Sequence, residues 1–271
     1  MTDIPSPTMS VPSRLGVTAE LDDGELTLVL HPRPETLHHG AIRASVVAYV
    51  IDAVAGLTVD GDPDVWTFTT DMSVRVRAVP APPRILATNT IVRQGRRSVT
   101  CTVELTSGDG APMATGAIGF AHVPRRDGDP PKPLVSPAAA PALFGDLGVL
   151  ARPLREEAGV EVLDAAEGVA QLVVTPELCN PAGTLQGAMV ALLAEAAAED
   201  LVTARFGAPA VVTDLDLRYL AKASEGPVRT RSRLLGTRPD APVEIELVDI
   251  STGTTTTLVY ARTVVGPVTR P

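Results

Sequence analysis

The chain has 271 residues, a net charge of −9 and a sequence pI of about 5.0. This length is enough for two ordinary domains, and an acidic chain without a dominant basic patch is not expected to bind nucleic acid. Two cysteines, Cys101 and Cys179, cannot form a disulfide framework, and no Cys/His cluster has metal-ligand spacing. The composition predicts a cytoplasmic protein without a metal or other cofactor.

Residues 1–13 are rich in Pro and Ser and lack the features of a signal peptide, so we expect a disordered tail there. The strand-like run Gly24–Leu30 follows. The next run, Ala41–Val59, is apolar, but it contains Arg43 and Asp52, whose charges would be costly in lipid. It is therefore expected to be a buried helix, and no membrane partner is predicted.

The rest of the chain alternates strand-like runs with one more apolar helix. Residues 124–146 contain several prolines and are expected to form a semi-rigid linker that only tethers the flanking segments. Residues 187–206 are rich in Ala and Leu, and their first half is apolar on every face, which predicts a buried helix. The expected strands are Trp66–Arg77, Ile85–Arg93, Ser98–Leu105, Met113–Val123, Val160–Leu163, Val169–Thr175, Val211–Tyr219, Val228–Leu235, Val243–Ile250 and Thr254–Val265.

This order of elements occurs twice. Pro34–Ala41 ends in His-Gly-Ala and Pro181–Ala188 in Gln-Gly-Ala, which places Gly40 and Gly187 at an offset of 147 (187 − 40). Thr70–Ala78 matches Thr213–Ala221 at an offset of 143 (213 − 70). Extra residues are therefore expected between the helix and strand of the first copy, in the turn-forming cluster at 61–64. The pattern predicts a duplicated small domain whose copies pack together.

One long apolar helix followed by antiparallel strands resembles the hotdog fold. The resemblance implies an α+β double hotdog, with tandem repeats at 14–123 and 147–268, each wrapping an antiparallel sheet around a long central helix. In that family two units pair side by side and their sheets become continuous. Single units also assemble further, which implies a homo-oligomer of two or three of these chains.

The second copy also resembles hotdog acyl-CoA thioesterases of the phenylacetate-pathway type. Many of these enzymes carry Asn, then Gly-x-x-His-Gly-Gly, then an acid on the helix. Here Asn180, Gln186 and Glu195 have the matching spacing, although Gln186 replaces His. The first copy keeps His39 but has Arg33 in place of Asn and Ala48 in place of the acid.

In this family the helix N-terminus comes from one unit and the carboxylate from the other. The resemblance therefore implies two mixed sites, of which we expect the first to be catalytic: His39, Gly40 and Glu195. The second is expected to be weakened or to bind ligand only: Asn180, Gln186, Gly187, Asp52 and Thr69. N–H groups at a helix start would stabilise the oxyanion of thioester hydrolysis, and burial would raise the pKa of a carboxylate toward neutrality.

Simpler interpretations of the same residues stay open. Glu195 fits a buried ion pair with an arginine as well as it fits catalysis on residue type alone, and Asn180 commonly caps a loop. His39 fits a loop position equally well. The turn containing Arg96 and Arg97 resembles an Arg-x-Gly-Arg-Ser stretch of these enzymes and could hold coenzyme A phosphates or be solvated.

The predicted function is hydrolysis of an acyl-CoA thioester to the free acid and coenzyme A, assisted by a carboxylate and without a metal. One alternative is a non-catalytic acyl-CoA-binding protein, because several motif positions depart from the family pattern. The other is a hotdog hydratase or dehydratase, which ranks last because no Asp lies at the required spacing from His39.

Overall fold

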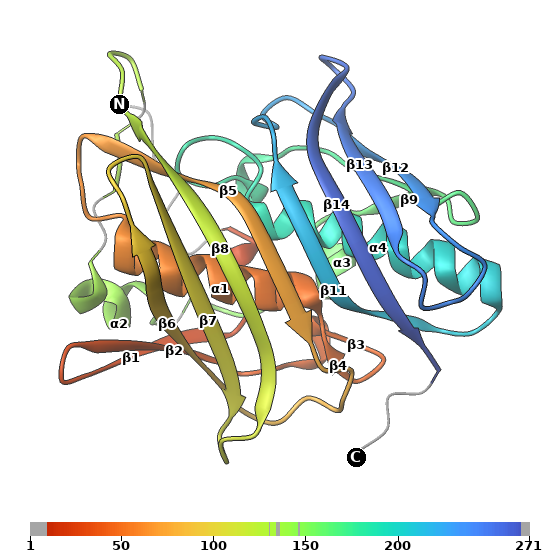
Figure 1. Ribbon diagram of the computed structural model, residues 1–271, viewed down its shortest axis with the longest axis horizontal. Coiled ribbons are helices and arrows are strands. Elements are labelled where there is room, and N and C mark those ends of the chain that lie inside the picture. Colours follow the sequence, from red (N-terminus) through yellow and green to blue (C-terminus); the bar gives the residue numbers. More distant parts are fainter. Residues whose placement is uncertain (1–9, 130, 134–135, 146, 267–271) are drawn as a thin grey trace.

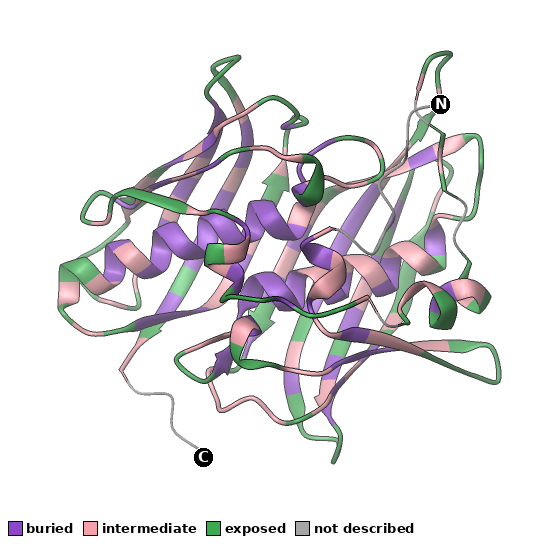
Figure 2. Ribbon diagram, turned by 180° about the vertical axis from the view of Figure 1, so that it is seen from behind, coloured by how far each residue is buried: buried purple, intermediate pink, exposed green. Residues whose placement is uncertain are grey.

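A single twelve-stranded sheet carries two long helices on one face in the computed structural model (Figures 1 and 2). The structure describes residues 10–129, 131–133, 136–145 and 147–266, so most of the expected tail lies outside the described residues. The strands follow the order β1-β2-β6-β7-β8-β5-β11-β14-β13-β12-β10-β9. All adjacent strands in this sheet are antiparallel.

The first half of the sheet packs against helix α1 (Ala44–Val59), and the second half packs against helix α4 (Gly187–Phe206). The strands of the first half are β1 (Val17–Asp22), β2 (Glu25–Leu30), β5 (Val65–Val76), β6 (Ile85–Gln94), β7 (Ser98–Ser107) and β8 (Pro112–Pro124). Those of the second half are β9 (Glu161–Asp164), β10 (Val169–Leu172), β11 (Ala210–Tyr219), β12 (Val228–Leu234), β13 (Val243–Asp249) and β14 (Thr254–Val265). Nearly all were predicted from the sequence; β1 was not.

Shorter elements connect these strands and helices. They are the hairpin strands β3 (Leu37–His38) and β4 (Ala41–Ile42), the helices α2 (Ala140–Leu143) and α3 (Leu154–Glu157), and the 3-10 turns Pro12–Arg14, Pro34–Thr36, Pro137–Ala139 and Pro176–Leu178. No helix among the described residues is long and apolar enough to cross a membrane.

Strands β5 and β11 join the two halves with a symmetric register. Ser73 pairs with Asp216, which lies 143 positions later (216 − 73), and the pairs on either side are related by the same offset. The register of β5 shifts between Thr69 and Asp71, and that of β11 shifts between Val212 and Asp214, again 143 positions apart. A local two-fold relation therefore passes through the centre of the sheet.

The starts of the two helices are 143 positions apart, the same offset as in strands β5 and β11. This corrects the expected alignment of Gly40 with Gly187. Arg43 precedes α1 with φ −66° and ψ 138°, and Gln186 precedes α4 with φ −66° and ψ 140°. These residues, 143 positions apart, are therefore equivalent. Aligning Gly40 with Gly187 shifted the first copy by about one helical turn. The connection between helix and strand is longer in the first copy, at residues 60–64 against 207–209, because α1 has 16 residues and α4 has 20, and not because residues are inserted.

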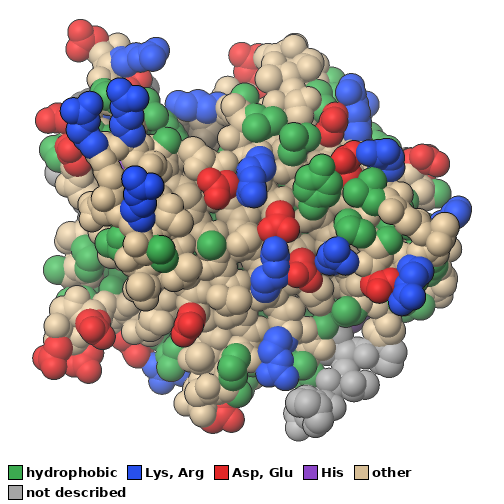
Figure 3. All heavy atoms as spheres, viewed as in Figure 1, with side chains coloured by type: hydrophobic (Ala, Val, Ile, Leu, Met, Phe, Trp, Pro, Cys, Tyr) green, Lys and Arg blue, Asp and Glu red, His purple; other side chains and the backbone are tan. Residues whose placement is uncertain are grey.

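The helices fill the space above the sheet because both are almost entirely apolar on the buried side. Buried Val, Leu, Ile and Ala side chains of both halves form one core, and the helices appear largely purple in Figure 2. Helix α4 ends at Gly207, whose φ of 71° suits glycine at a helix C-terminus. On the opposite face of the sheet, Arg75 forms ion pairs with Asp214 and Asp216, where charges of both signs alternate (Figure 3).

Two segments predicted to be loosely attached make specific contacts where they are described. Val11 is buried, and its N–H donates to the Glu177 carbonyl at 2.9 Å, so ordered structure begins inside the expected tail. In the linker, Ala140 is buried and α2 packs against β1. The linker is thus partly built into the first half.

Candidate functional site

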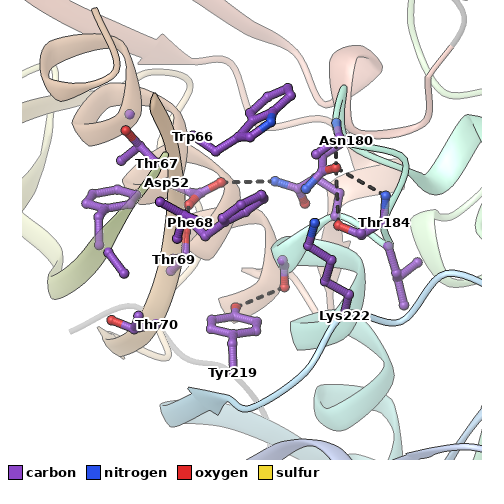
Figure 4. A pocket seen from close by; sticks show the side chains of 18 of the residues that line it. Asp52, Trp66, Thr67, Phe68, Thr69, Thr70, Asn180, Thr184, Tyr219 and Lys222 are labelled. Atoms are coloured by element: carbon purple, nitrogen blue, oxygen red, sulfur yellow. Dashed lines mark hydrogen bonds between the residues drawn. The ribbon is translucent and has the colours of Figure 1, made fainter. Parts of the chain in front are cut away.

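A cavity of about 500 Å³ opens where β5 and β11 separate. Their pairing ends at Asp71 and Arg218, so the preceding part of β5 leaves space beside the start of α4. Walls come from α1, β5, β8, the loop before α4, the segment after β11 and the linker. The cavity thus lies at the junction of the two halves (Figure 4).

Asp52 of α1 lies in this cavity between two hydrogen-bond donors. Thr69 Oγ1 on β5 donates to Asp52 Oδ1 at 2.7 Å, and Gln186 Nε2 donates to Asp52 Oδ2 at 3.2 Å (Figure 4). Burial raises the pKa of Asp52, and these two hydrogen bonds offset only part of that rise. The result is an oriented carboxylate whose affinity for protons is greater than that of an ordinary aspartate.

Gln186 is oriented by the helix that it precedes. Its side-chain Oε1 accepts a hydrogen bond from the Ala188 N–H at 2.6 Å, which satisfies one of the free donors at the start of α4. The amide oxygen is therefore held by the helix, and the amide nitrogen faces Asp52. Only 8 % of the Gln186 residue is exposed.

The first N–H of α4 is available beside this carboxylate. The Gly187 N–H has no hydrogen-bond acceptor within the described parts of the chain. Tyr219 Oη donates to the Gly187 carbonyl at 3.2 Å. A Cβ on Gly187 would lie 3.1 Å from Tyr219 Oη. Glycine therefore allows the helix start to pack closely against Tyr219, and the free N–H and helix dipole can stabilise a negative charge.

The mouth of the cavity combines a rigid loop with aromatic side chains. Asn180 Oδ1 accepts hydrogen bonds from Ala182 N, Thr184 N and Thr184 Oγ1 at 3.0–3.2 Å, so it caps the loop before α4. On the other side, Trp66 stacks on Phe68, and Lys222 Nζ lies 4.4 Å from the Phe68 ring centroid (Figure 4). The loop-capping interpretation of Asn180 is thus confirmed, and the residue also lines the cavity.

Glu195, the residue equivalent to Asp52 at the offset of 143, occupies a different environment. It is fully buried, and its oxygens accept hydrogen bonds from Ala44 N at 2.7 Å and from Ser45 Oγ. Arg43 Nη1 lies 3.6 Å from Glu195 and 3.1 Å from Glu199. The buried ion pair considered as an alternative for Glu195 is therefore present.

His38 completes this buried cluster. Arg43 Nη2 lies 3.2 Å from His38 Nδ1, and His38 Nε2 lies 3.2 Å from the Ala210 carbonyl. Burial and then Arg43 lower the pKa of His38 to about 3, so the ring is neutral near pH 7. A neutral ring that accepts from Arg43 at Nδ1 donates from Nε2 to Ala210. Burial raises the pKa of Glu199 to about 8.

His39 and Gly40 do not lie at the start of the helix, contrary to expectation. They form the two-residue turn between β3 and β4, with φ of 49° and 85°, in the left-handed region that such hairpin turns require. Both are exposed, and helix α1 begins four residues after Gly40. Neither residue, nor Glu195, lines the 500 Å³ cavity.

Arg96 and Arg97 are exposed at the turn between β6 and β7 and do not line the cavity. Their turn is nevertheless close to its wall, because the Arg97 carbonyl accepts a hydrogen bond from His122 N at 2.9 Å on β8. Among the described residues, no group of three or more His, Cys, Asp and Glu side chains could hold a metal ion.

Comparison with solved structures places this architecture among known folds. The tesB protein of Mycobacterium avium subsp. paratuberculosis aligns with a TM-score of 0.64 and 11% identity over 95% of this chain and 98% of the other. A conserved protein with a hot dog fold from Alicyclobacillus acidocaldarius aligns with a TM-score of 0.58 and 14% identity over 94% of this chain and 97% of the other. The chain has the hotdog fold.

Another structural neighbour is the 12:0-ACP thioesterase of Umbellularia californica, which has a TM-score of 0.58 and 9% identity over 89% of this chain and 97% of the other. No protein-family model matches the sequence, and no curated protein matches it. At these identities the similarity establishes the hotdog fold alone.

The structure brings Asp52, Thr69, Gln186 and Gly187 together in one cavity, but sequence reasoning missed the partners that distinguish the two halves. Arg43, His38, Glu199, Tyr219 and Lys132 were not proposed as parts of either site. The strand sequences contained the signal. Applying the strand offset of 143 to the helices as well makes Asp52 equivalent to Glu195 and Arg43 equivalent to Gln186.

Proposed function

We propose that the protein is an acyl-CoA thioesterase built from two hotdog units in tandem, and that hydrolysis takes place in the cavity at Asp52. One observation carries this proposal. The Asp52 carboxylate, oriented by Thr69 and Gln186, lies in the same cavity as the free N–H of Gly187 at the start of α4. A base and an oxyanion donor are the two groups that thioester hydrolysis needs.

The chemistry follows from this arrangement. Asp52 takes a proton from a water molecule as the water oxygen bonds to the thioester carbon. The negative charge that develops on the carbonyl oxygen is stabilised by the Gly187 N–H and the helix dipole. As the tetrahedral intermediate collapses, the carbon–sulfur bond breaks, and the proton on Asp52 passes to the departing thiolate. The raised pKa of Asp52 makes its carboxylate a stronger base than that of an ordinary aspartate.

The His39–Gly40–Glu195 assignment is replaced in this proposal. Glu195 is buried and accepts hydrogen bonds on both oxygens, and neither of the other two residues lies at a helix start. The cluster of Arg43, Glu195 and Glu199 occupies the position related by the local two-fold to the Asp52 site. One chain would then have one active site and one site closed by charged side chains.

Coenzyme A as the carrier of the acyl group is supported by one exposed cation at the rim of the cavity and two on a turn beside its β8 wall. Lys222 is exposed at the rim, and Arg96 and Arg97 are exposed on a turn beside the β8 wall. Guanidinium and ammonium groups bind phosphates, so these three side chains are candidates for the phosphates of coenzyme A. A homo-oligomer of such chains stays a prediction.

The direct test is release of free thiol from acetyl-, octanoyl-, palmitoyl- and phenylacetyl-CoA by the wild-type protein and by Asp52→Asn. The proposal predicts that the wild type cleaves at least one ester and that the variant loses this activity while keeping its thermal unfolding midpoint. Binding of the same esters is measured by calorimetry. Binding without cleavage would support the acyl-CoA-binding alternative and reject the enzyme.

A further inference from the structure

A groove leads from Asp52 along one face of α1. Asp52, Gly56 and Asp60 all line the cavity, and residues four positions apart lie on the same side of a helix. At 1.5 Å per residue, Asp60 lies about 12 Å from Asp52 along the helix axis. A Cβ placed on Gly56 would have no atom within 4 Å, so the groove is open midway.

Lys132 of the linker closes the far end of this groove. Its Nζ donates to Asp60 Oδ1, to the Asp62 carbonyl and to the Val65 carbonyl, each at 2.7 Å, and lies 3.3 Å from the Asp60 carbonyl. The side chain is only 1 % exposed. Lys132 therefore binds the C-terminus of α1, although it is 72 positions beyond Asp60 in sequence.

These contacts fix the linker as a wall of the cavity. A buried ammonium is costly unless it is paired, and here oxygens satisfy all of its donors. Its charge is also favourable near the carbonyl end of α1. Because Asp60 Oδ1 and the carbonyls of Asp62 and Val65 accept its three N–H groups, Lys132 has no free donor for a phosphate. Lys132 and Pro133 both line the cavity, so the linker takes part in shaping it.

Apolar side chains form part of the remaining walls. Phe120, Val190 and Trp66 line the cavity, and the glycine at position 56 leaves its floor clear. In the other half, the residue at the offset of 143 from Gly56 is Glu199, whose side chain is buried against Arg43. The space that Gly56 leaves open in the first half is therefore occupied in the second.

Building on the thioesterase function proposed above, we propose that this groove receives the acyl group and that the Lys132–Asp60 contact limits its length. A fully extended chain advances about 3.5 Å per three bonds, so a groove of about 12 Å holds about ten bonds. Acyl groups up to this length fit with the linker in place. Longer ones must displace Lys132.

The test is the length profile of kcat/KM for butyryl-, octanoyl-, dodecanoyl- and palmitoyl-CoA. Lys132→Met removes the donor while keeping an unbranched side chain, and should raise the palmitoyl-to-octanoyl ratio by about tenfold. Gly56→Leu fills the groove and should lower the octanoyl-to-butyryl ratio by a similar factor. Arg126→Met is the matched control, because Arg126 is an exposed linker cation that does not line the cavity.

The two substitutions act in opposite directions, which keeps the test decisive. If Lys132→Met does not fold, as judged by circular dichroism, the Gly56→Leu profile alone decides. Unchanged profiles in the folded variants, with normal wild-type hydrolysis, would overturn the role of the groove and leave the thioesterase in place. Wild-type protein that cleaves no ester would instead reject the proposed function itself.

Discussion

Asp52 and Glu195 lie 143 positions apart, the same separation as Ser73 and Asp216 at the centre of the sheet, and each carboxylate faces the start of the other half's helix. Asp52 receives a hydrogen bond from the Gln186 side chain, and Glu195 receives one from the Ala44 N–H. The first opens onto a cavity and the second is fully buried. Equivalent positions have thus acquired different surroundings.

The difference arises from the residues around each carboxylate. Gln186 precedes α4 and leaves its amide nitrogen for Asp52, whereas Arg43 precedes α1 and binds both Glu195 and Glu199. Arg43 and the two buried acidic side chains form a compact, closed cluster, while a neutral amide leaves room for a substrate. The charge cluster therefore explains why the second position would be inactive.

Replacing Gln186 by Glu should separate helix capping from catalysis. A carboxylate oxygen can still accept from the Ala188 N–H, so α4 should begin normally. The donor to Asp52 is lost, and a second negative charge raises the Asp52 pKa further. We expect thiol release at pH 7 to fall roughly 10- to 100-fold and the acidic limb of the pH–rate profile to move to higher pH. An unchanged acidic limb would contradict the role given to the amide.

Gly187→Ala tests the close packing at the helix start. The new Cβ would lie 3.1 Å from Tyr219 Oη, so the first turn of α4 must shift. We expect kcat to fall about tenfold or more with a smaller change in KM, because an oxyanion donor is worth roughly 100- to 1,000-fold. The double variant with Tyr219→Phe removes the obstructing oxygen and should recover part of the activity. No recovery would show that steric contact with Tyr219 is not the cause.

The buried cluster should make stability depend on pH through Glu199. Burial raises its pKa from 4.5 to about 8 in the folded protein, so the folded state holds the proton more tightly. Its contribution to stability is full below about pH 4.5 and declines as pH rises toward about 8. Glu199→Gln should therefore reduce the loss of unfolding free energy between pH 5 and pH 9 in urea titrations. The exposed Glu167→Gln is the control, and identical pH dependence in all three proteins would refute this role.

Most of the fold could be predicted from the sequence because periodicity and turn residues are local signals. Helix α4 and strand β14 match their predicted bounds, since a glycine directly follows each of them. Strand β1 was missed, because Val17–Asp22 is short and ends in acidic residues. The joining of β5 to β11 followed only from the resemblance, since strand pairing between halves leaves no local signal.

The candidate site was predicted less well, for a specific reason. Gly-Ala occurs after position 39 and after position 186, and this local likeness suggested that both mark a helix start. The structure places Gly40 in a hairpin turn, where a left-handed φ requires a permissive residue, and Gly187 at the helix start. The same residue type served two different purposes, so only the offset of the strands could have corrected the alignment.

The most direct test of the account compares Asp52→Asn with Glu195→Gln in the same thiol-release assay, below the unfolding temperature of each variant. We expect Asp52→Asn to lose roughly 100- to 10,000-fold in rate with little change in thermal unfolding. Glu195→Gln should keep the rate within a few-fold but unfold at a lower temperature, because it breaks a buried ion pair. Loss of activity in Glu195→Gln with full activity in Asp52→Asn would contradict the assignment of the active site.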